Sequence, residues 1–271
     1  MDRYVVIGNP VSHSLSPAIH AHFARQTGEP IEYATLEAPR DDFASAARLF
    51  FDGGGAGANV TLPFKVDALR FAAQASDRAA AAGAANFLAR RDGRIEADNT
   101  DGVGLLADLT RNLGLRLAGS RILLLGAGGA ARGVIAPLLA ASPARLVIAN
   151  RTPARAVELA QRFASGVRID AYALDAIPQD DFDLVLNATS TSTNAQALPL
   201  AAHVLRPSAF AYDMAYGPAA REFVARARSL GMRASDGLGM LVEQAAESFF
   251  LWRGERPETQ RVLAELRQRF A

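Results

Sequence analysis

The chain has 271 residues, of which 50% are hydrophobic and 21% charged, and its formal net charge is +1. This balance is that of an ordinary globular protein, and so small a net charge gives no general attraction to nucleic acid or to a membrane surface. Cysteine is absent, which excludes disulfides and thiol chemistry and fits a cytoplasmic protein. We see neither a signal peptide nor an apolar run of the length that spans a membrane, and therefore expect a soluble intracellular protein.

Short apolar runs alternate with helical patterns in the N-terminal part of the chain. The runs predict strands at residues 4–7, 31–36, 58–60, 86–89 and 95–97. The helical patterns cover residues 17–27, 41–51 and 77–82. Ser16 is expected to be the N-cap of the first helix, with Pro17 at its first helical position. The alternation predicts an α/β fold with a mostly parallel sheet.

Polar residues stand at the ends of several predicted elements. Ser14 and Ser16 suit recognition of a carboxylate or of hydroxyls at a helix start, although capping alone would explain Ser16. Thr61 and Lys65 follow the third strand, at the edge of an open sheet where ligands bind. A lysine that begins a helix is more often simply solvated. Asp101 begins another helical stretch, and a role in its first turn fits the spacing as well as a catalytic role does.

The most informative stretch is Arg121–Gly133, where an apolar run enters a glycine-rich turn. The run predicts a strand buried on both faces, and residues 129–141 predict the helix that follows. Gly126, Gly128 and Ala131 then form a dinucleotide-binding turn. Gly126 allows the tight turn, Gly128 allows close approach of a pyrophosphate, and Ala131 allows helix and strand to pack closely.

The end of the next predicted strand, residues 146–149, indicates which dinucleotide binds. An NAD site usually has an acidic residue there, which binds the ribose 2′-hydroxyl. This chain has Arg151 and Arg155 instead, as a 2′-phosphate would require. A solvated basic helix start is the alternative, but cations at a helix N-terminus oppose its dipole. The pattern favours NADP.

Further elements follow the nucleotide-binding turn. Apolar runs predict strands at residues 183–186 and 210–213, and helical patterns cover 219–230 and 257–270. Residues 240–249 predict a helix in which Gln244 interrupts an apolar stripe, so a ligand hydroxyl or an internal partner must satisfy its amide. The four histidines are not spaced as metal ligands, and we expect no metal site.

These motifs together resemble shikimate dehydrogenases, nearly from end to end. The resemblance rests on Ser14-Leu15-Ser16-Pro17, Asn59-Val60-Thr61-Leu62-Pro63-Phe64-Lys65, Asp98-Asn99-Thr100-Asp101-Gly102, the glycine turn, Asn150-Arg151-Thr152, Asn187-Ala188-Thr189-Ser190, Tyr212-Asp213-Met214, and Asp236-Gly237-Leu238-Gly239-Met240 with Gln244. It implies two α/β domains. A substrate domain would combine residues 1–101 and 238–271, with a mostly parallel sheet formed from both chain ends, and a Rossmann-type NADP domain would cover residues 102–237.

The resemblance also implies the roles of individual residues. Lys65 and Asp101 would form the catalytic pair. The substrate carboxylate would be bound by Ser14, Ser16 and Tyr216, and its oxygen substituents by Thr61, Asn86 and Gln244. The cofactor-binding residues would be Gly126, Ala127, Gly128, Gly129, Ala130, Asn150, Arg151, Thr152, Arg155, Thr189, Met214 and Gly237.

The implied reaction is the reversible NADPH-dependent reduction of 3-dehydroshikimate to shikimate, in the shikimate pathway of aromatic amino-acid biosynthesis. Lys65 would exchange a proton with the ring oxygen that changes between ketone and hydroxyl, and Asp101 would orient Lys65 and that hydroxyl. The expected partner is this small-molecule substrate, with neither nucleic acid nor membrane. A homodimer is compatible with the reading.

Two departures from the family pattern and two alternative functions stand beside this reading. Asn86 is present, but Ala85 and Phe87 flank it where the family usually has Val and Thr. The loop at 191–194 lacks the usual glycine, which bears on cofactor contacts. One alternative is a quinate/shikimate dehydrogenase that accepts both substrates, with either NADP or NAD as its cofactor. The other is a non-catalytic dinucleotide sensor, although a sensor has no need of a proton-transfer pair such as Lys65 and Asp101.

Overall fold

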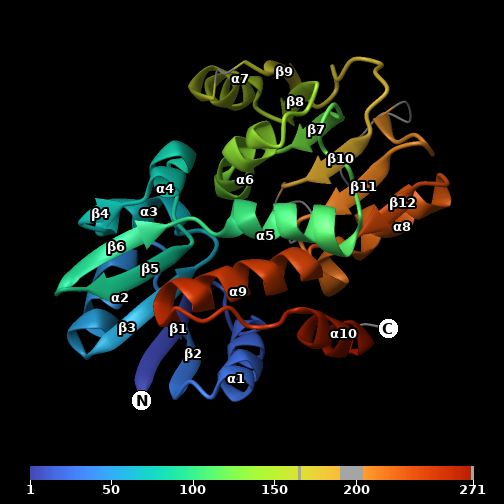
Figure 1. Cartoon of the computed structure of the whole chain (residues 1–271). Coiled ribbons are helices and arrows are strands. Elements are labelled where there is room, and N and C mark those ends of the chain that lie inside the picture. The colour runs from blue at the N-terminus through green and yellow to red at the C-terminus, as the bar shows by residue number, and fades with distance from the viewer. Residues whose placement is uncertain (164–165, 190–203, 270–271) are drawn as a thin grey trace. The chain divides into compact units, whose positions relative to one another are not determined.

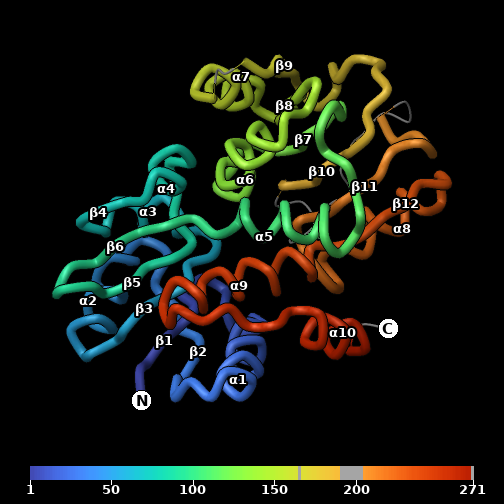
Figure 2. The backbone as a smooth tube through the Cα atoms, viewed as in Figure 1, coloured from blue at the N-terminus to red at the C-terminus, as the bar shows by residue number. Residues whose placement is uncertain are grey.

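The computed structural model describes residues 1–163, 166–189 and 204–269 (Figure 1). The chain divides into two compact units, one of Met1–Gly104 with Leu241–Ala271 and the other of Leu105–Met240. Figure 2 traces the backbone from the first unit into the second along α5 (Asp101–Ala107) and back along α9 (Leu238–Arg253). The domain boundaries expected from the sequence, after residues 101 and 237, each fall three residues earlier in the chain than these divisions.

The first unit contains a six-stranded sheet of order β2-β1-β3-β5-β6-β4. Its strands are β1 (Asp2–Gly8), β2 (Ile31–Glu37), β3 (Gly55–Val60), β4 (Gln74–Ala75), β5 (Phe87–Arg91) and β6 (Arg94–Asp98). Three pairings are parallel, β1 with β2, β1 with β3 and β4 with β6, whereas β5 is antiparallel to both β3 and β6. All six strands come from the N-terminal part of the chain, so the sheet is not formed from both chain ends as the resemblance implied. The C-terminal part adds the helices α9 and α10 (Gln260–Gln268) to this unit.

Side-chain alternation along the strands gives this sheet two packed faces. The helices from the N-terminal part are α1 (Ser16–Thr27), α2 (Phe43–Asp52), α3 (Lys65–Phe71) and α4 (Asp77–Ala82). On one face Ile7 packs in a core with Phe43 of α2 and Phe64 beside α3. On the other face the Tyr4 ring lies 4.6 Å from that of Trp252 in α9. Successive residues of a strand point to opposite faces, so the α9 face can collect the polar side chains described below.

The second unit contains a six-stranded sheet in which every pairing between its strands is parallel. The strands are β7 (Arg121–Leu125), β8 (Arg145–Asn150), β9 (Arg168–Ala173), β10 (Leu184–Asn187), β11 (Phe210–Asp213) and β12 (Arg233–Ser235). Their spatial order is β12-β11-β10-β7-β8-β9. Numbered within the unit and read from the β9 edge, this is the 3-2-1-4-5-6 order of the dinucleotide-binding fold.

Helices cover both faces of the second sheet. They are α6 (Gly129–Ala140), α7 (Pro153–Arg162) and α8 (Arg221–Ser229), with a π-helical turn at Asp108–Asn112 and a 3-10 turn at Gly217–Ala220. Leu124 packs in one core with Val134 of α6, and its neighbour Leu125 packs in another with Phe223 of α8. The apolar runs predicted from the sequence are therefore strands buried on both faces.

Several predicted helix starts were wrong. The helix predicted from residue 41 begins at Phe43, with Asp42 as its N-cap. Ser16 is not an N-cap, because α1 already begins there and the Ser14 hydroxyl accepts a hydrogen bond from the Ser16 backbone amide at 3.2 Å. The helix predicted from residue 219 is a 3-10 turn followed by α8. The last helix begins at Gln260 rather than at residue 257, because Gln26 binds the backbone amide of Glu258, and Thr259 binds Glu243 of α9. No described helix is both long and apolar enough to cross a membrane.

Candidate functional site

Lys65 and Asp101 form a nearly buried ion pair in the first unit. Lys65 is the first residue of α3, directly after the β3 loop, and Asp101 is the first residue of α5. Lys65 Nζ lies 2.6 Å from Asp101 Oδ2, and the side chains are only 13% and 6% exposed. Lys65 is therefore not the solvated lysine that its position in the sequence also allowed, and its ammonium is available in a site that excludes most water.

Asn86 connects this pair to two further segments. Its Nδ2 lies 2.8 Å from Asp101 Oδ1, 2.9 Å from Thr100 Oγ1 and 3.2 Å from Gln244 Oε1. Its Oδ1 accepts a hydrogen bond from the Thr100 backbone amide at 2.7 Å. The two oxygens of Asp101 thus accept from different donors, Lys65 and Asn86, which fixes the plane of the carboxylate.

The Gln244 side-chain amide has hydrogen-bond partners within the protein, as expected for a polar group in an apolar stripe. Its Oε1 accepts from Asn86 and lies 3.3 Å from Thr100 Oγ1, and its Nε2 donates to the Leu241 carbonyl at 2.8 Å. The structure therefore brings together Lys65, Asp101, Asn86 and Gln244, four of the predicted site residues. They come from α3, α5, the start of β5 and α9.

A second set of polar side chains lies between the two serines and this cluster. Burial raises the pKa of Tyr33 well above its ordinary value of 10.0, although a hydrogen bond with Ser16 acts in the opposite direction and lowers that pKa. The Tyr33 hydroxyl donates to Asn59 Oδ1 at 2.8 Å, and Asn59 Nδ2 donates to Ser248 Oγ at 2.9 Å. Neither Tyr33 nor Asn59 was predicted to have a role. The sequence did contain a signal for Asn59, because it stands between two apolar residues of a buried strand, where a polar side chain needs a hydrogen-bond partner.

Thr61 follows β3 and is partly buried. Its backbone amide donates to the Ile7 carbonyl at 2.9 Å, which holds it beside the end of β1. A Cβ atom added to Gly8 would lie 2.6 Å from Thr61 Cγ2, so glycine leaves the room for this threonine. Tyr216, the remaining predicted substrate residue, belongs to the second unit, where it precedes the 3-10 turn.

The glycine-rich turn of the second unit has the geometry that a dinucleotide needs. Gly126 has φ of +109°, and an added Cβ atom would lie 2.9 Å from the Ala188 carbonyl oxygen. Gly128 precedes α6 with an ordinary φ of −87°, and a Cβ there would meet nothing within 4 Å. Gly126 is therefore required by the fold, whereas the open space at Gly128 lets a ligand approach the start of α6.

The end of β8 presents the two predicted arginines to solvent. Arg151 and Arg155 are both exposed, and no ion pair is found for either among the residues that the structure describes. Asn150 Nδ2 donates to the Thr152 carbonyl at 2.9 Å and so closes the turn that contains Arg151. The turn thus leaves both guanidinium groups available for an anion.

The other predicted cofactor residues follow β10, β11 and β12. Thr189 donates through its hydroxyl to Asn187 Oδ1 at 2.7 Å. A Cβ atom on Gly237 would lie 2.4 Å from the Met214 carbonyl oxygen, so the two segments approach each other closely. The carboxyl ends of the parallel strands thereby converge at one edge, where ligands of such sheets bind. The glycine-free loop at 191–194 lies outside the described residues.

Comparisons with known proteins decide the family. A model described as the shikimate dehydrogenase substrate binding domain matches residues 6–88. Models described as shikimate / quinate 5-dehydrogenase and as the shikimate 5'-dehydrogenase C-terminal domain match residues 108–215 and 237–267. The chain belongs to the shikimate dehydrogenase family. The predicted resemblance and the two-domain α/β fold class are confirmed.

Relatives within the shikimate dehydrogenase family align along nearly the whole chain. The NADP(+) shikimate dehydrogenase of Dechloromonas aromatica is 54% identical over 98% of this chain and 97% of its own. The solved Ael1 enzyme of Pseudomonas putida is 48% identical, with a TM-score of 0.90 and coverage of 98% of each chain. Shikimate 5-dehydrogenase of Thermus thermophilus, solved with NADP(H) and shikimate, is 33% identical, with a TM-score of 0.86 and coverage of 99% of each chain.

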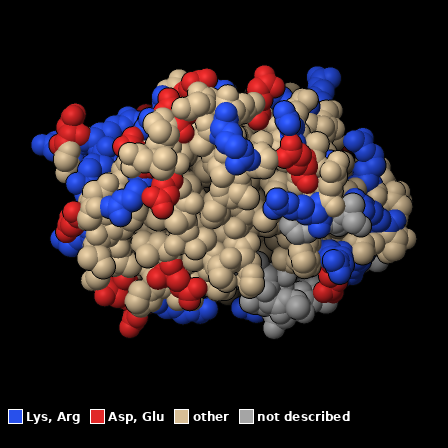
Figure 3. Space-filling model, turned by 90° about the horizontal axis from the view of Figure 1, so that it is seen from below, with Lys and Arg blue, Asp and Glu red and all other residues tan. Residues whose placement is uncertain are grey.

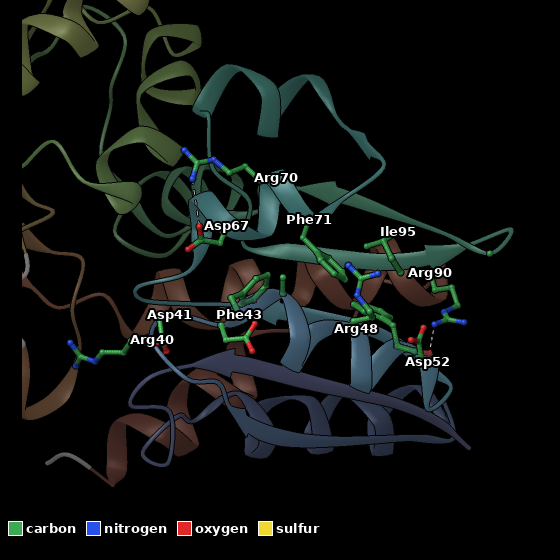
Figure 4. Close-up of a pocket in the computed structure, with 14 residues that line it drawn as sticks. Arg40, Asp41, Phe43, Arg48, Asp52, Asp67, Arg70, Phe71, Arg90 and Ile95 are labelled. Atoms are coloured by element: carbon green, nitrogen blue, oxygen red, sulfur yellow. Dashed lines mark hydrogen bonds and ion pairs between the residues drawn. The ribbon is translucent and has the colours of Figure 1, made fainter.

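The first unit also contains a cavity of about 640 Å³ that is separate from the Lys65 and Asp101 site. No predicted site residue lines it. Four arginines and four aspartates line it, so its charges balance. Figure 4 shows Arg70 beside Asp67, with which it forms an ion pair at 3.7 Å. Arg90 lies elsewhere in the lining, and its guanidinium is over the Phe51 ring. The face in Figure 3 likewise intersperses acidic and basic side chains. Among the described residues no group of His, Cys, Asp and Glu could hold a metal ion.

Proposed function

We propose that this protein catalyses the reversible NADPH-dependent reduction of 3-dehydroshikimate to shikimate. The observation that supports it most strongly is the buried contact of Lys65 with Asp101, which Asn86 and Gln244 surround. This arrangement occurs in a chain about half identical to NADP(+) shikimate dehydrogenases over nearly its full length. The reaction is one step of the shikimate pathway of aromatic amino-acid biosynthesis.

Lys65 is the proton carrier in this proposal. In the direction of reduction its ammonium donates a proton to the oxygen that develops negative charge at the reduced ring carbon. In the reverse direction its amine accepts the proton of that hydroxyl. Asp101 holds Lys65 through the 2.6 Å contact, and the hydrogen bond from Asn86 keeps the carboxylate plane fixed. Both groups need this orientation, because proton transfer depends on hydrogen-bond distance to the substrate oxygen.

The substrate is bound through its carboxylate and its ring oxygens. Ser14 and Ser16 bind the carboxylate with Tyr216, and Thr61, Asn86 and Gln244 bind the oxygens. The amide groups suit this role, because each offers both a donor and an acceptor to a hydroxyl. Asn86 and Gln244 already contact each other at 3.2 Å, so one ring hydroxyl can reach both.

NADP fits the residues of the second unit. The open space at Gly128 and the start of α6 would hold the pyrophosphate, and Arg151 and Arg155 would hold the 2′-phosphate. When bound, the nicotinamide would supply or take up the hydride. Thr189, Met214 and Gly237 lie after neighbouring strands of the same sheet and complete the site on the side of β10 and β11.

Three finer points belong to the same proposal. Substrate breadth is open to quinate, because the family model over residues 108–215 is described for shikimate and quinate together. We place the protein in the cytoplasm on the basis of its cysteine-free composition. A homodimer is the assembly that we would test first, by light scattering.

The direct test follows NADPH fluorescence with purified protein, offering shikimate or quinate together with NADP or NAD. We expect rapid reduction of NADP with shikimate, slower reduction of NAD, and a large loss in Lys65→Ala. An absence of turnover with shikimate and either cofactor, in protein that still binds NADP, would contradict the enzymatic function and support a dinucleotide sensor. Faster turnover with quinate than with shikimate would change the substrate assignment but not the roles of Lys65 and Asp101.

A further inference from the structure

Arg78 of α4 joins two acidic side chains from distant parts of the first unit. Its Nε lies 3.0 Å from Asp98 Oδ1 and its Nη2 lies 2.5 Å from Asp98 Oδ2, which is a two-pronged contact with one carboxylate. Its Nη1 lies 3.0 Å from Glu247 Oε1. Asp98 is the last residue of β6, and Glu247 lies in the middle of α9. Arg78 thus connects the end of β6 to α9, and 169 positions separate it from Glu247 in the chain.

Asp98 passes this constraint on to Asp101 by two short routes. Asp98 Oδ1 accepts from the Asn99 backbone amide at 2.6 Å, and Asn99 Oδ1 accepts from the Asp101 backbone amide at 3.1 Å. The Asp98 carbonyl accepts from the Asn86 backbone amide at 3.2 Å, and the Asn86 side chain donates to Asp101. Both the backbone and the carboxylate of Asp101 therefore depend on where Asp98 lies.

Glu247 carries the constraint to the other side of the site. It lies three residues after Gln244, so the two occupy nearby positions on the same helix. Holding Glu247 fixes the rotation of α9, which decides whether Gln244 and Ser248 face Asn86 and Thr100. A small rotation of α9 would break these contacts without unfolding the helix.

The two carboxylates of this cluster are largely removed from water, whereas the Arg78 side chain that joins them is 35% exposed. Burial alone would raise the pKa of Asp98, but hydrogen bonds from Arg78 and Ser76 outweigh it and hold that pKa below its ordinary value. Glu247 also pairs with Arg256, so it keeps a cationic partner when Arg78 is removed. Buried ion pairs contribute little net stability compared with apolar packing, so stability alone does not account for this arrangement.

We propose that Arg78 is a positioning residue, which sets the geometry of Asp101 and Gln244 around the proton carrier Lys65. It touches none of the predicted substrate-binding groups and acts through Asp98 and Glu247. The inference rests on the proposed roles of Lys65 and Asp101. It adds to them a residue on a separate helix that aligns the two sides of the site.

The test compares Arg78→Gln with Arg253→Gln. Arg253 is the last residue of α9, the helix that carries Glu247. It pairs with Glu29 and Asp2 and touches no predicted site residue. Both variants lose a clamp between α9 and other segments of the first unit. We expect Arg78→Gln to lower kcat by about 10- to 100-fold, because a misplacement of the order of 1 Å costs about this much. We expect the KM for NADPH to stay unchanged, and Arg253→Gln to keep wild-type kcat even where its melting temperature falls.

Two further measurements separate positioning from loss of folding. Guanidinium ion at low millimolar concentration, with sodium chloride as control, should restore part of the kcat of Arg78→Ala. Arg78→Lys should keep the fold and recover only part of kcat, because an ammonium cannot make the two-pronged contact. Wild-type kcat in Arg78→Gln, or equal losses of kcat in Arg78→Gln and Arg253→Gln, would overturn the proposal. Lys65→Ala serves as reference, since undiminished activity there would contradict the catalytic roles themselves rather than the role of Arg78.

Discussion

Lys65 Nζ lies 2.6 Å from Asp101 Oδ2, although 36 positions separate the two residues in the chain. The contact is nearly closed to solvent, so each group is the principal counter-charge of the other. Removing one partner of a buried pair leaves the other charge uncompensated, which costs far more than the net value of the pair. Single substitutions at this contact should therefore disturb the remaining partner as well.

We expect Arg151→Ala to weaken NADP binding by about 10- to 100-fold, since a hydrogen bond to a charged group contributes about 1.5–3 kcal/mol. NAD lacks the 2′-phosphate, and its affinity should be unaffected. Fluorescence titration with both cofactors measures the difference. Arg228→Ala is the matched control, because that exposed arginine lies in the last turn of α8 and donates to the Ala234 carbonyl instead. Equal losses for NADP and NAD would contradict the 2′-phosphate assignment.

Alanine at the two glycines of the nucleotide turn should separate folding from binding. Gly126→Ala places a Cβ atom at positive φ and against the Ala188 carbonyl, so it should lower stability by about 1–3 kcal/mol. Gly128→Ala meets nothing in the protein and should keep the melting temperature, but raise the KM for NADPH. Thermal melts without cofactor, together with NADPH titrations, check both. An unchanged KM in Gly128→Ala would place the pyrophosphate elsewhere.

Ser14→Ala should raise the KM for shikimate more than it lowers kcat, because the proposed contact is with the carboxylate and not with the reacting carbon. Tyr216→Phe should act in the same direction. A substrate analogue without the carboxylate should respond to neither change. If both substitutions harm that analogue as much as they harm shikimate, the carboxylate site lies elsewhere.

His20 should make folding stability depend on pH. Burial lowers the pKa of this histidine from 6.5 to about 3, and its ring stacks on Tyr33 at 4.1 Å. Between pH 6.5 and pH 3 this histidine is protonated in the unfolded chain and neutral in the folded protein. The free energy of unfolding therefore falls as the pH drops below about 6.5, by about 1.4 kcal/mol per pH unit. Urea unfolding at pH 7 and pH 5 should show a smaller loss in His20→Phe than in the wild type. The exposed His13 provides the control substitution, and identical losses in wild type and His20→Phe would contradict the account.

The sequence predicted the elements of the fold well, because its apolar runs and small-residue turns are local signals. The strand before Gly126 and the arginines after β8 could be identified without any long-range contact. Helix starts were less predictable, since the Ser14 hydroxyl accepts the amide at the start of α1 and Ser16 itself is the first residue of that helix. The delayed start of the last helix depends on a distant partner, Gln26, which no local pattern reveals.

Motif resemblance predicted the residues of the site, whereas residue spacing alone left Lys65 and Asp101 as ordinary surface or helix-start residues. Their surroundings include Gln244 of α9, which contacts Asn86 beside Asp101 and comes from the far end of the chain. The connecting groups were missed for the same reason. Asn59 and Arg78 show their importance only when Ser248 and Glu247 of α9 are in place.

Lys65 and Asp101 act as one proton-transfer unit in the proposed mechanism, and a double-mutant cycle on kcat measures the coupling between them. General acid–base catalysis contributes about 10²–10⁴-fold, so Lys65→Ala should lower kcat by that order and leave NADP binding intact. Asp101→Asn keeps the shape of the side chain but removes its charge, and should also lose turnover. We expect the double variant to be far less impaired than the product of the two single losses. Fully multiplicative losses, or near-wild-type kcat in Lys65→Ala, would contradict it.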